Sequence, residues 1–260
     1  MKDNFLKKTV KGIFFREGSI RTIFWGPLRG CRYRVSCHSG LSALYSGNER
    51  IHQKCFSRLI NPGDTVIDVG ANWGVHTLLM SKLVGPSGRV IAIEPDPNAV
   101  SDLRFNQRLN GCENITVNQV AAADSEGEIA LYLAKSSSLN TIESDRQQAG
   151  LSEKLMVKVT RLDSIVEDLK LGNLCLIKID VEGAESQVLQ GAESILRNQR
   201  PYFVIDLHTP EQDLSVAGIL IAHRYRLQRP EGPPILRTDL SWPHREGVWG
   251  SILASPVEKG

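Results

Sequence analysis

The sequence lacks the features that mark membrane proteins, exported proteins and cysteine-based metal domains. None of its apolar runs approaches the about 18 residues that a membrane-spanning helix requires. Residues 1–15 carry charges where a signal peptide would be continuously apolar, so we expect a cytoplasmic protein. The five cysteines are an odd number without C-x-x-C spacing, which favours free thiols over disulfides or a zinc site.

Little else in the composition is unusual. At 260 residues, with 41% hydrophobic and 23% charged residues, the chain is long enough for one substantial globular core. It has no internal repeat. We therefore expect a single α/β domain with additions.

The net charge of +2 conceals an uneven distribution. Residues 1–60 contain 12 Lys or Arg and 3 Asp or Glu, whereas the remainder contains 19 basic and 26 acidic residues. We expect a basic N-terminal extension over 1–58, before the main domain at 59–260. Within it, apolar residues at near-helical spacing lie among lysines: Phe5, Leu6, Val10, Ile13 and Phe14. Such a basic amphipathic helix would dock on the core as a cap, on anionic lipid, on nucleic acid or across an acidic substrate.

A strand, a glycine turn and a helix follow one another over residues 64–84. Residues 65–69 are β-branched except for Asp68, as is typical of a parallel strand covered on both faces. An unpaired carboxylate in a core costs several kcal/mol, so we expect Asp68 to face hydrogen-bond donors at the end of the strand. Gly70 and Gly74 permit a sharp turn and a close approach of the helix to a ligand.

The spacing in this turn argues against a dinucleotide. The pattern G-x-G-x-x-G is missing, because Asn72 and Trp73 occupy the region where a glycine would admit a pyrophosphate. A second strand over 89–94 ends in Glu94, which lies 20 residues beyond Gly74. An acid at this position suits a grip on two ribose hydroxyls. The alternative is an ordinary βαβ unit.

Three separated segments carry a family resemblance: residues 66–74 (VIDVGANWG), 93–97 (IEPDP) and 176–185 (LIKIDVEGAE). Within 59–208 they resemble, in order, the FkbM family of methyltransferases. The resemblance implies a doubly wound, mostly parallel, Rossmann-like class I methyltransferase fold. It also implies S-adenosylmethionine as the methyl donor, with transfer most often to an oxygen of a sugar, a polyketide or another small molecule.

Ligands of an open parallel sheet bind outside the carboxyl ends of its strands, at the point where strand order reverses. On the cofactor half we expect Asp68, Gly70, Asn72, Gly74, Glu94, Asp96, Ala121 and Ala122. Asp68 and Asn72 would hold the methionine end and Glu94 the ribose. Asp96 or the backbone of 121–122 would contact the adenine. Asp96 precedes a proline, so a helix cap is its alternative role.

The other half would hold the acceptor, and here we expect Lys178, Asp180, Glu182, Glu185 and His208. Lys178 and Asp180 lie on one side of a predicted strand over 174–181, and the buried lysine needs an ion pair, with Asp180 or Glu185. Asp180 would orient the acceptor hydroxyl or take its proton. His208, after a strand over 202–207, would be the general base, with a structural role as the alternative. In some small-molecule methyltransferases an acid at the position of Glu182 also binds a divalent metal. The spacing establishes no set of oxygen ligands here, so we predict no metal site and leave metal dependence open.

The remaining expected elements surround this site. They are strands over 115–120, 128–133 and 156–160, a lid or linker over 134–150, a helix over 164–169 capped by Asp163, a helix over 185–190, and an antiparallel pair of strands over 225–228 and 248–253. His76 would line or pack beneath the cofactor site.

The sequence thus predicts an S-adenosylmethionine-dependent enzyme that methylates a hydroxyl on a small molecule or saccharide. One alternative is an RNA or protein methyltransferase, which the basic extension supports. Against it, the sequence lacks the alternation of aromatic and basic residues that binds single-stranded nucleic acid. The other is a non-catalytic, cofactor-binding regulatory protein. The sequence specifies neither the acceptor nor the oligomeric state.

Overall fold

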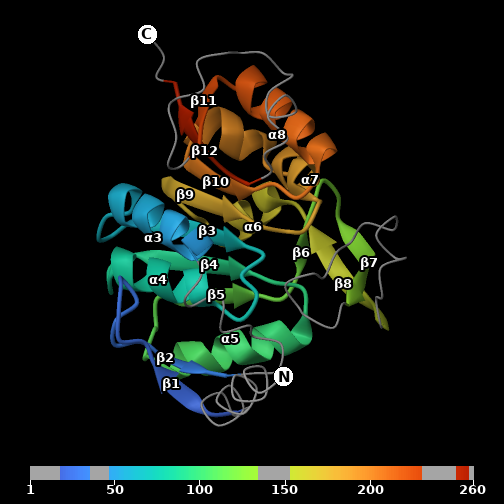
Figure 1. Cartoon of the computed structure of the whole chain (residues 1–260). Coiled ribbons are helices and arrows are strands. Elements are labelled where there is room, and N and C mark those ends of the chain that lie inside the picture. The colour runs from blue at the N-terminus through green and yellow to red at the C-terminus, as the bar shows by residue number, and fades with distance from the viewer. Residues whose placement is uncertain (1–17, 36–46, 134–152, 230–249, 258–260) are drawn as a thin grey trace, which may run out of the picture.

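A computed structural model of the protein describes residues 18–35, 47–133, 153–229 and 250–257 (Figure 1). Its centre is a seven-stranded sheet in the order β11-β12-β10-β9-β3-β4-β5. In this sheet β12 alone runs in the direction opposite to the other strands. The strands are β3 (Thr65–Val69), β4 (Arg89–Ile93), β5 (Ile115–Asn118), β9 (Leu174–Ile179), β10 (Tyr202–Asp206), β11 (Tyr225–Gln228) and β12 (Ser251–Pro256). The expected doubly wound, mostly parallel sheet is confirmed.

Helices cover both faces of this sheet because side chains alternate along each buried strand. Val66 of β3 belongs to a core cluster with residues of α3 (Gly47–Leu59), α4 (Val75–Val84) and α5 (Pro97–Leu109). Ile67 and Val69 belong to the opposite cluster, formed with α6 (Leu162–Asp168), α7 (Glu185–Gln190) and α8 (Pro210–Ala222). Asp68 and Lys178 alternate with apolar residues of these clusters and are themselves buried.

Strand order reverses between β3 and β9, which are parallel neighbours although the chain visits β4 and β5 between them. The register pairs Val69 with Ile179, so the residues that follow the two strands meet at one edge. At this edge the backbone of Gly70 (φ 74°) lies against the backbone of Asp180. A Cβ added at Gly70 would lie 1.8 Å from the carbonyl oxygen of Asp180. Only glycine permits this contact between the two halves.

The described part of the basic extension docks on the core. β1 (Ile20–Thr22) and β2 (Arg32–Arg34) form a hairpin against α5, where Arg34 pairs with Asp102 and lies 4.1 Å from the centre of the Phe105 ring. The buried Tyr33 donates a hydrogen bond to the carbonyl of Trp73. Helix α3 runs across the boundary expected after residue 58. The amphipathic helix expected over residues 5–14 lies outside the described residues.

A smaller sheet stands beside the main one (Figure 1). It contains β6 (Ala121–Ala122), β7 (Gly127–Leu133) and β8 (Glu153–Thr160), with β8 between the other two. The strands expected over 128–133 and 156–160 are confirmed, and both begin earlier than predicted. The lid or linker expected over 134–150 lies outside the described residues.

Two local predictions need correction. Helix α6 begins at Leu162, and Asp163 does not cap it; its carboxylate accepts hydrogen bonds from the backbone of Ser194 and Ile195, where the π-helical turn Ile195–Gln199 begins. The antiparallel pair at the sheet edge is confirmed, but the described part of its last strand begins at Ser251 rather than at 248.

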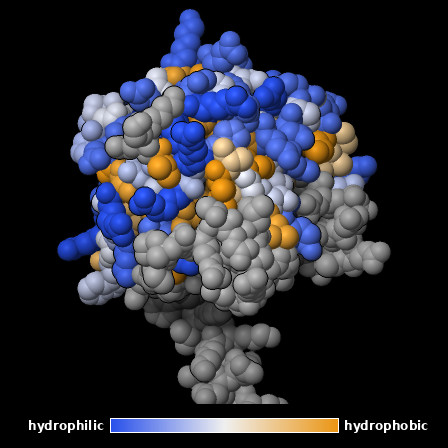
Figure 2. Space-filling model, turned by 90° about the horizontal axis from the view of Figure 1, so that it is seen from above, coloured by the Kyte–Doolittle hydropathy of each residue, from blue (hydrophilic) through white to orange (hydrophobic). Residues whose placement is uncertain are grey.

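No helix in the described ranges is long and apolar enough to cross a membrane. Seen from above the view of Figure 1, apolar residues of the described surface form small separate groups among hydrophilic ones (Figure 2). That face therefore presents no single broad apolar patch among the residues described.

Candidate active site

A buried lysine joins the two halves of the sheet at the reversal point. Strand register places Lys178 of β9 beside Asp68 of β3. Its Nζ lies 3.3 Å from Asp68 Oδ1 and 3.4 Å from Asp180 Oδ2, and it donates a hydrogen bond to the carbonyl of Gly70. Burial alone would lower the pKa of Lys178, but attraction to Asp68 and then Asp180 outweighs burial and raises it. The expected ion pair with Asp180 is confirmed, and Asp68, not Glu185, is the second partner.

Asp68 lies beneath the glycine turn. It has 0% exposure, and its Oδ2 accepts a hydrogen bond of 2.6 Å from the Thr77 hydroxyl. Asp68 therefore faces hydrogen-bond donors as expected, but these donors are side chains of the protein and not a ligand. In this arrangement Asp68 would support a cofactor site by holding the turn in place.

Glu94 has the environment expected of a group that binds hydroxyls. Only 7% exposed, it accepts the backbone N–H of Asn72 at 2.7 Å on one oxygen and that of Asp96 at 2.9 Å on the other. Burial raises its pKa to about 7, because these two hydrogen bonds offset the loss of water only in part. A carboxylate offers about four acceptor positions, so two hydroxyl donors would complete its hydrogen bonding.

The other cofactor-side candidates have structural partners. Asp96 caps α5 by accepting the backbone N–H of Asn98 at 2.9 Å, which matches its alternative role. Gly74 precedes α4 with φ 91°, where an added Cβ would lie 2.9 Å from a Leu103 side-chain carbon. Ala121 and Ala122 are buried and pair with β8.

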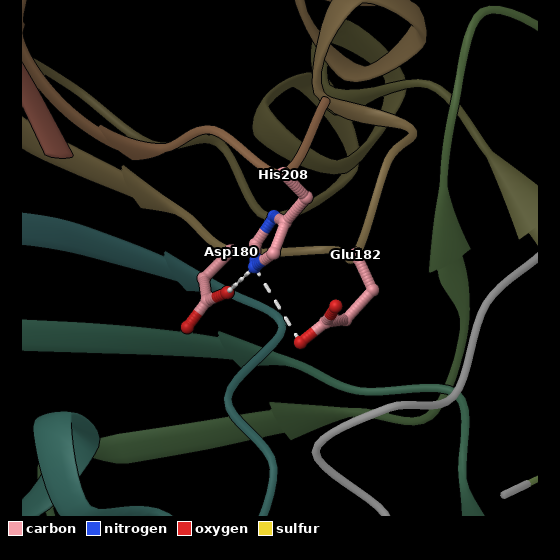
Figure 3. A group of neighbouring side chains, drawn as sticks. All are labelled: Asp180, Glu182 and His208. Carbon is pink, nitrogen blue, oxygen red and sulfur yellow. Dashed lines mark ion pairs between the residues drawn. The ribbon is translucent and has the colours of Figure 1, made fainter. Parts of the chain in front are cut away.

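The acceptor-side residues gather around one imidazole (Figure 3). Nε2 of His208 lies 3.5 Å from Asp180 Oδ1 and 3.4 Å from Glu182 Oε1. Asp180 follows β9, Glu182 lies in the turn before α7, and His208 lies between β10 and α8. All three side chains are partly exposed, at 31%, 18% and 22% for Asp180, Glu182 and His208.

Glu185 orients this imidazole from behind. It has 0% exposure, and its Oε1 lies 2.7 Å from His208 Nδ1 and accepts the backbone N–H of Gly183. A carboxylate only accepts, so Nδ1 carries the hydrogen and Nε2 faces Asp180 and Glu182. Glu185 was expected on the substrate side, but it lies behind the histidine.

The surrounding carboxylates change the protonation of His208. Burial lowers its pKa, but the hydrogen bond to Glu185 and the charges of Asp180 and Glu182 outweigh burial and raise it to about 9. In this arrangement His208 is mostly protonated at neutral pH. Its Nε2 accepts a proton only when the one already held is displaced.

A neighbouring polar cluster joins Asp206, which the end of its strand makes predictable from sequence, to two residues that were not predicted, His52 and Ser251. His52 of α3 lies with Nε2 3.0 Å from Asp206 Oδ1 and 3.0 Å from the Ser251 hydroxyl, which also donates to Asp206. Burial raises the pKa of Asp206, but the hydrogen bond and charge of His52 prevail and lower it below its ordinary value. The buried His76 packs with its ring centre 5.0 Å from that of His52. No local motif marks His52 or Ser251, because their partner is remote in the chain.

Comparison with known proteins matches residues 68–227 to the methyltransferase FkbM domain. The 31-O-demethyl-FK506 methyltransferase FkbM of Streptomyces tacrolimicus is 26% identical over 232 residues, which cover 76% of this chain and 87% of that protein. The hexuronic acid methyltransferase AglP of Haloferax volcanii is 24% identical over 212 residues, which cover 80% of this chain and 84% of that protein.

The fold is also similar to a solved structure. The FkbM methyltransferase from Methylobacillus flagellatus matches with a TM-score of 0.51 at 18% identity, over 82% of this chain and 54% of that one. The family match over residues 68–227 spans more than half of the chain and includes both Asp68 and His208, which lie on the two sides of the reversal point. The expected family and the expected enzyme class are confirmed. The chain belongs to the FkbM family and is a methyltransferase.

Proposed function

We propose that the protein uses S-adenosylmethionine to methylate a hydroxyl oxygen on a small molecule or saccharide. The observation that carries this proposal is the arrangement at the sheet edge. A buried carboxylate, Glu94, lies beside the glycine turn on one half, and the partly exposed group of Asp180, Glu182 and His208 lies on the other.

The cofactor half fits the methyl donor. Glu94 would accept the two ribose hydroxyls, which supply the donors that its buried oxygens lack. Gly70, Asn72 and Gly74 would let the backbone approach the ligand, and Asp68 would hold this turn from below. When bound, S-adenosylmethionine supplies a methyl group already activated by its sulfonium charge. The protein therefore contributes chiefly orientation and proton removal.

The acceptor half would position the hydroxyl. Lys178 fixes one oxygen of Asp180, and the other, Oδ1, lies toward His208 where an acceptor hydroxyl would donate to it. Nε2 of His208 would receive the hydroxyl proton after it has lost to solvent the proton that its raised pKa lets it hold at neutral pH. The names of two relatives, an FK506 O-methylating enzyme and a hexuronic acid methyltransferase, support an oxygen acceptor on a polyketide or a sugar.

Nucleic acid is less well supported as the acceptor. Two of the described arginines of the basic extension are used within the fold: Arg32 contacts the end of α5 through Leu109 and Asn110, and Arg34 pairs with Asp102. Arginines engaged in this way are poor candidates for phosphate contacts.

The test separates binding from chemistry. S-adenosylhomocysteine release would be measured with macrolide alcohols, hexuronic acid glycosides, RNA and protein as acceptors, alongside calorimetric cofactor binding. Asp180→Asn and His208→Ala should keep cofactor affinity within a few-fold and lower the rate by roughly 100- to 10,000-fold. Loss of cofactor binding in both variants would place them on the wrong side of the site. Turnover of RNA alone would overturn the proposed acceptor class.

A further inference from the structure

We propose that Asp180, Glu182 and His208 form a binding site for a divalent cation of the Mn²⁺ or Mg²⁺ type. Its catalytic use, holding the acceptor oxygen, rests on the proposed function. The site itself does not.

The spacing of the three side chains suits a shared ion better than direct hydrogen bonds. One ligand atom from each residue lies within 4.8 Å of the other two. The separations of 3.4 and 3.5 Å from His208 Nε2 exceed the about 2.7–3.0 Å of charge-assisted hydrogen bonds. Ligands at right angles around an ion, each about 2.1–2.4 Å from it, lie about 3.0–3.4 Å apart. Small side-chain movements would therefore bring all three atoms onto one ion (Figure 3).

The buried Glu185 provides the second observation. Metal-binding histidines commonly donate their other ring N–H to a carboxylate, which fixes the ring and directs the remaining nitrogen at the metal. His208 donates its Nδ1–H in this way to Glu185 Oε1 at 2.7 Å, and Glu185 has 0% exposure. Its second oxygen, Oε2, is buried without a hydrogen-bond partner among the described residues. A fully buried carboxylate in this position implies a compensating positive charge nearby.

The local charge balance points the same way. Four carboxylates lie close together here, on Asp68, Asp180, Glu182 and Glu185. Lys178 and the imidazole of His208 are the basic side chains that pair with them. Lys178 is shared between Asp68 and Asp180, whereas the negative charges of Glu182 and Glu185 face the imidazole of His208. A divalent ion beside Nε2 would balance them.

The donor set selects the kind of ion. Two carboxylates and one imidazole, without a thiolate, suit a hard or borderline divalent ion such as Mn²⁺ or Mg²⁺. Such an ion keeps further coordination positions for water and for an acceptor oxygen. It would lower the pKa of a bound hydroxyl, whose proton would then pass to solvent water. In the metal-bound protein His208 would act as a ligand, and this role replaces the general-base role given to its Nε2 under the proposed function.

The experiment uses the full chain, stripped of metals with a chelator. Titration with Mn²⁺, followed through the electron paramagnetic resonance signal of free Mn²⁺, should reveal one site that Mg²⁺ competes for. Glu182→Gln should weaken this binding at least tenfold, as should His208→Ala. Glu193→Gln is the matched control, because Glu193 also faces an imidazole, His223 at 3.0 Å, but lies outside the site.

Two further readouts keep the outcomes distinct. Mn²⁺ should broaden the ring signals of His208 in the unmodified protein, which needs no variant to fold. Absence of binding at millimolar Mn²⁺, or equal weakening by Glu182→Gln and Glu193→Gln, would overturn the cation site. Metal-independent methylation would refute its catalytic use and leave the proposed function intact. Mn²⁺ binding without turnover of any acceptor would support the cation site and count against the proposed function.

Discussion

Replacement of Glu94 should weaken cofactor binding without unfolding the protein. The carboxylate is buried, and one backbone N–H holds each oxygen in place. Two ribose hydroxyls donating to it would make charge-assisted hydrogen bonds, whose joint loss is worth about 1.5–3 kcal/mol. Glu94→Ala should therefore raise the dissociation constant for S-adenosylmethionine roughly 10- to 150-fold in calorimetry.

The raised pKa of Glu94 adds a pH dependence to this prediction. With a folded pKa of about 7 against an ordinary 4.5, the protonated acid is favoured in the free protein. Its contribution to folding stability is full below pH 4.5 and is lost as pH rises through about 7. Cofactor affinity should change in the opposite direction, because the ionised carboxylate accepts hydroxyls more strongly.

The affinity of the wild-type protein for S-adenosylmethionine should therefore rise between pH 6 and pH 8, a range that brackets the Glu94 pKa of about 7. The affinity of Glu94→Gln should stay constant over the same range. Circular dichroism would confirm that the variants are folded. Unchanged affinity in a folded Glu94→Ala protein would refute the ribose role, and an equal pH dependence in Glu94→Gln would assign the titration to another group.

Two other predictions concern the junction between the halves. Lys178→Met should destabilise the fold by about 3–5 kcal/mol in denaturant unfolding, because Asp68 is left buried without its cation. A loss below about 1 kcal/mol would refute the stabilising role of this buried ion pair. Gly70→Ala should abolish stable folding or cofactor binding, because its Cβ would lie 1.8 Å from the carbonyl oxygen of Asp180. Gly85 (φ 65°, ψ −174°) also has a backbone conformation that favours glycine, but an added Cβ would meet no atom within 4 Å, so Gly85→Ala should cost only about 1–3 kcal/mol. Equal effects of the two alanines would remove the argument for close approach at Gly70.

Much of the fold follows from local pattern. The β-branched run at 65–69 and the proline that begins α5 identify their elements, because burial on both faces and a fixed φ act on the residues themselves. Asp163 was misassigned because its side chain serves a helical turn that begins at Ile195. A capping residue is recognisable in sequence, but the helix that it caps is decided by packing.

The site was predicted less completely than the fold, for a related reason. Strand-end residues could be collected from sequence, since parallel strands end at one edge. Their partners could not, because β3 and β9 are neighbours only after a crossover. Asp68 was therefore expected to face a ligand, although Lys178 and Thr77 engage it. The contact of His52 with Asp206 likewise spans 154 residues and leaves no local signal.

Lys178 also determines which experiments are informative at this site. Its Nζ reaches Asp68 and the Gly70 carbonyl on the cofactor half, and Asp180 on the acceptor half. Removing it would loosen the glycine turn and release Asp180 at once, so lost activity in Lys178→Met would not distinguish cofactor binding from chemistry. Asp180→Asn keeps the shape of the side chain, leaves the pair of Lys178 with Asp68 in place and alters only the partly exposed carboxylate. A lower methylation rate with unchanged cofactor affinity in Asp180→Asn therefore assigns Asp180 to the acceptor side, whereas a matching loss of affinity would mean that the two halves act as one unit through Lys178.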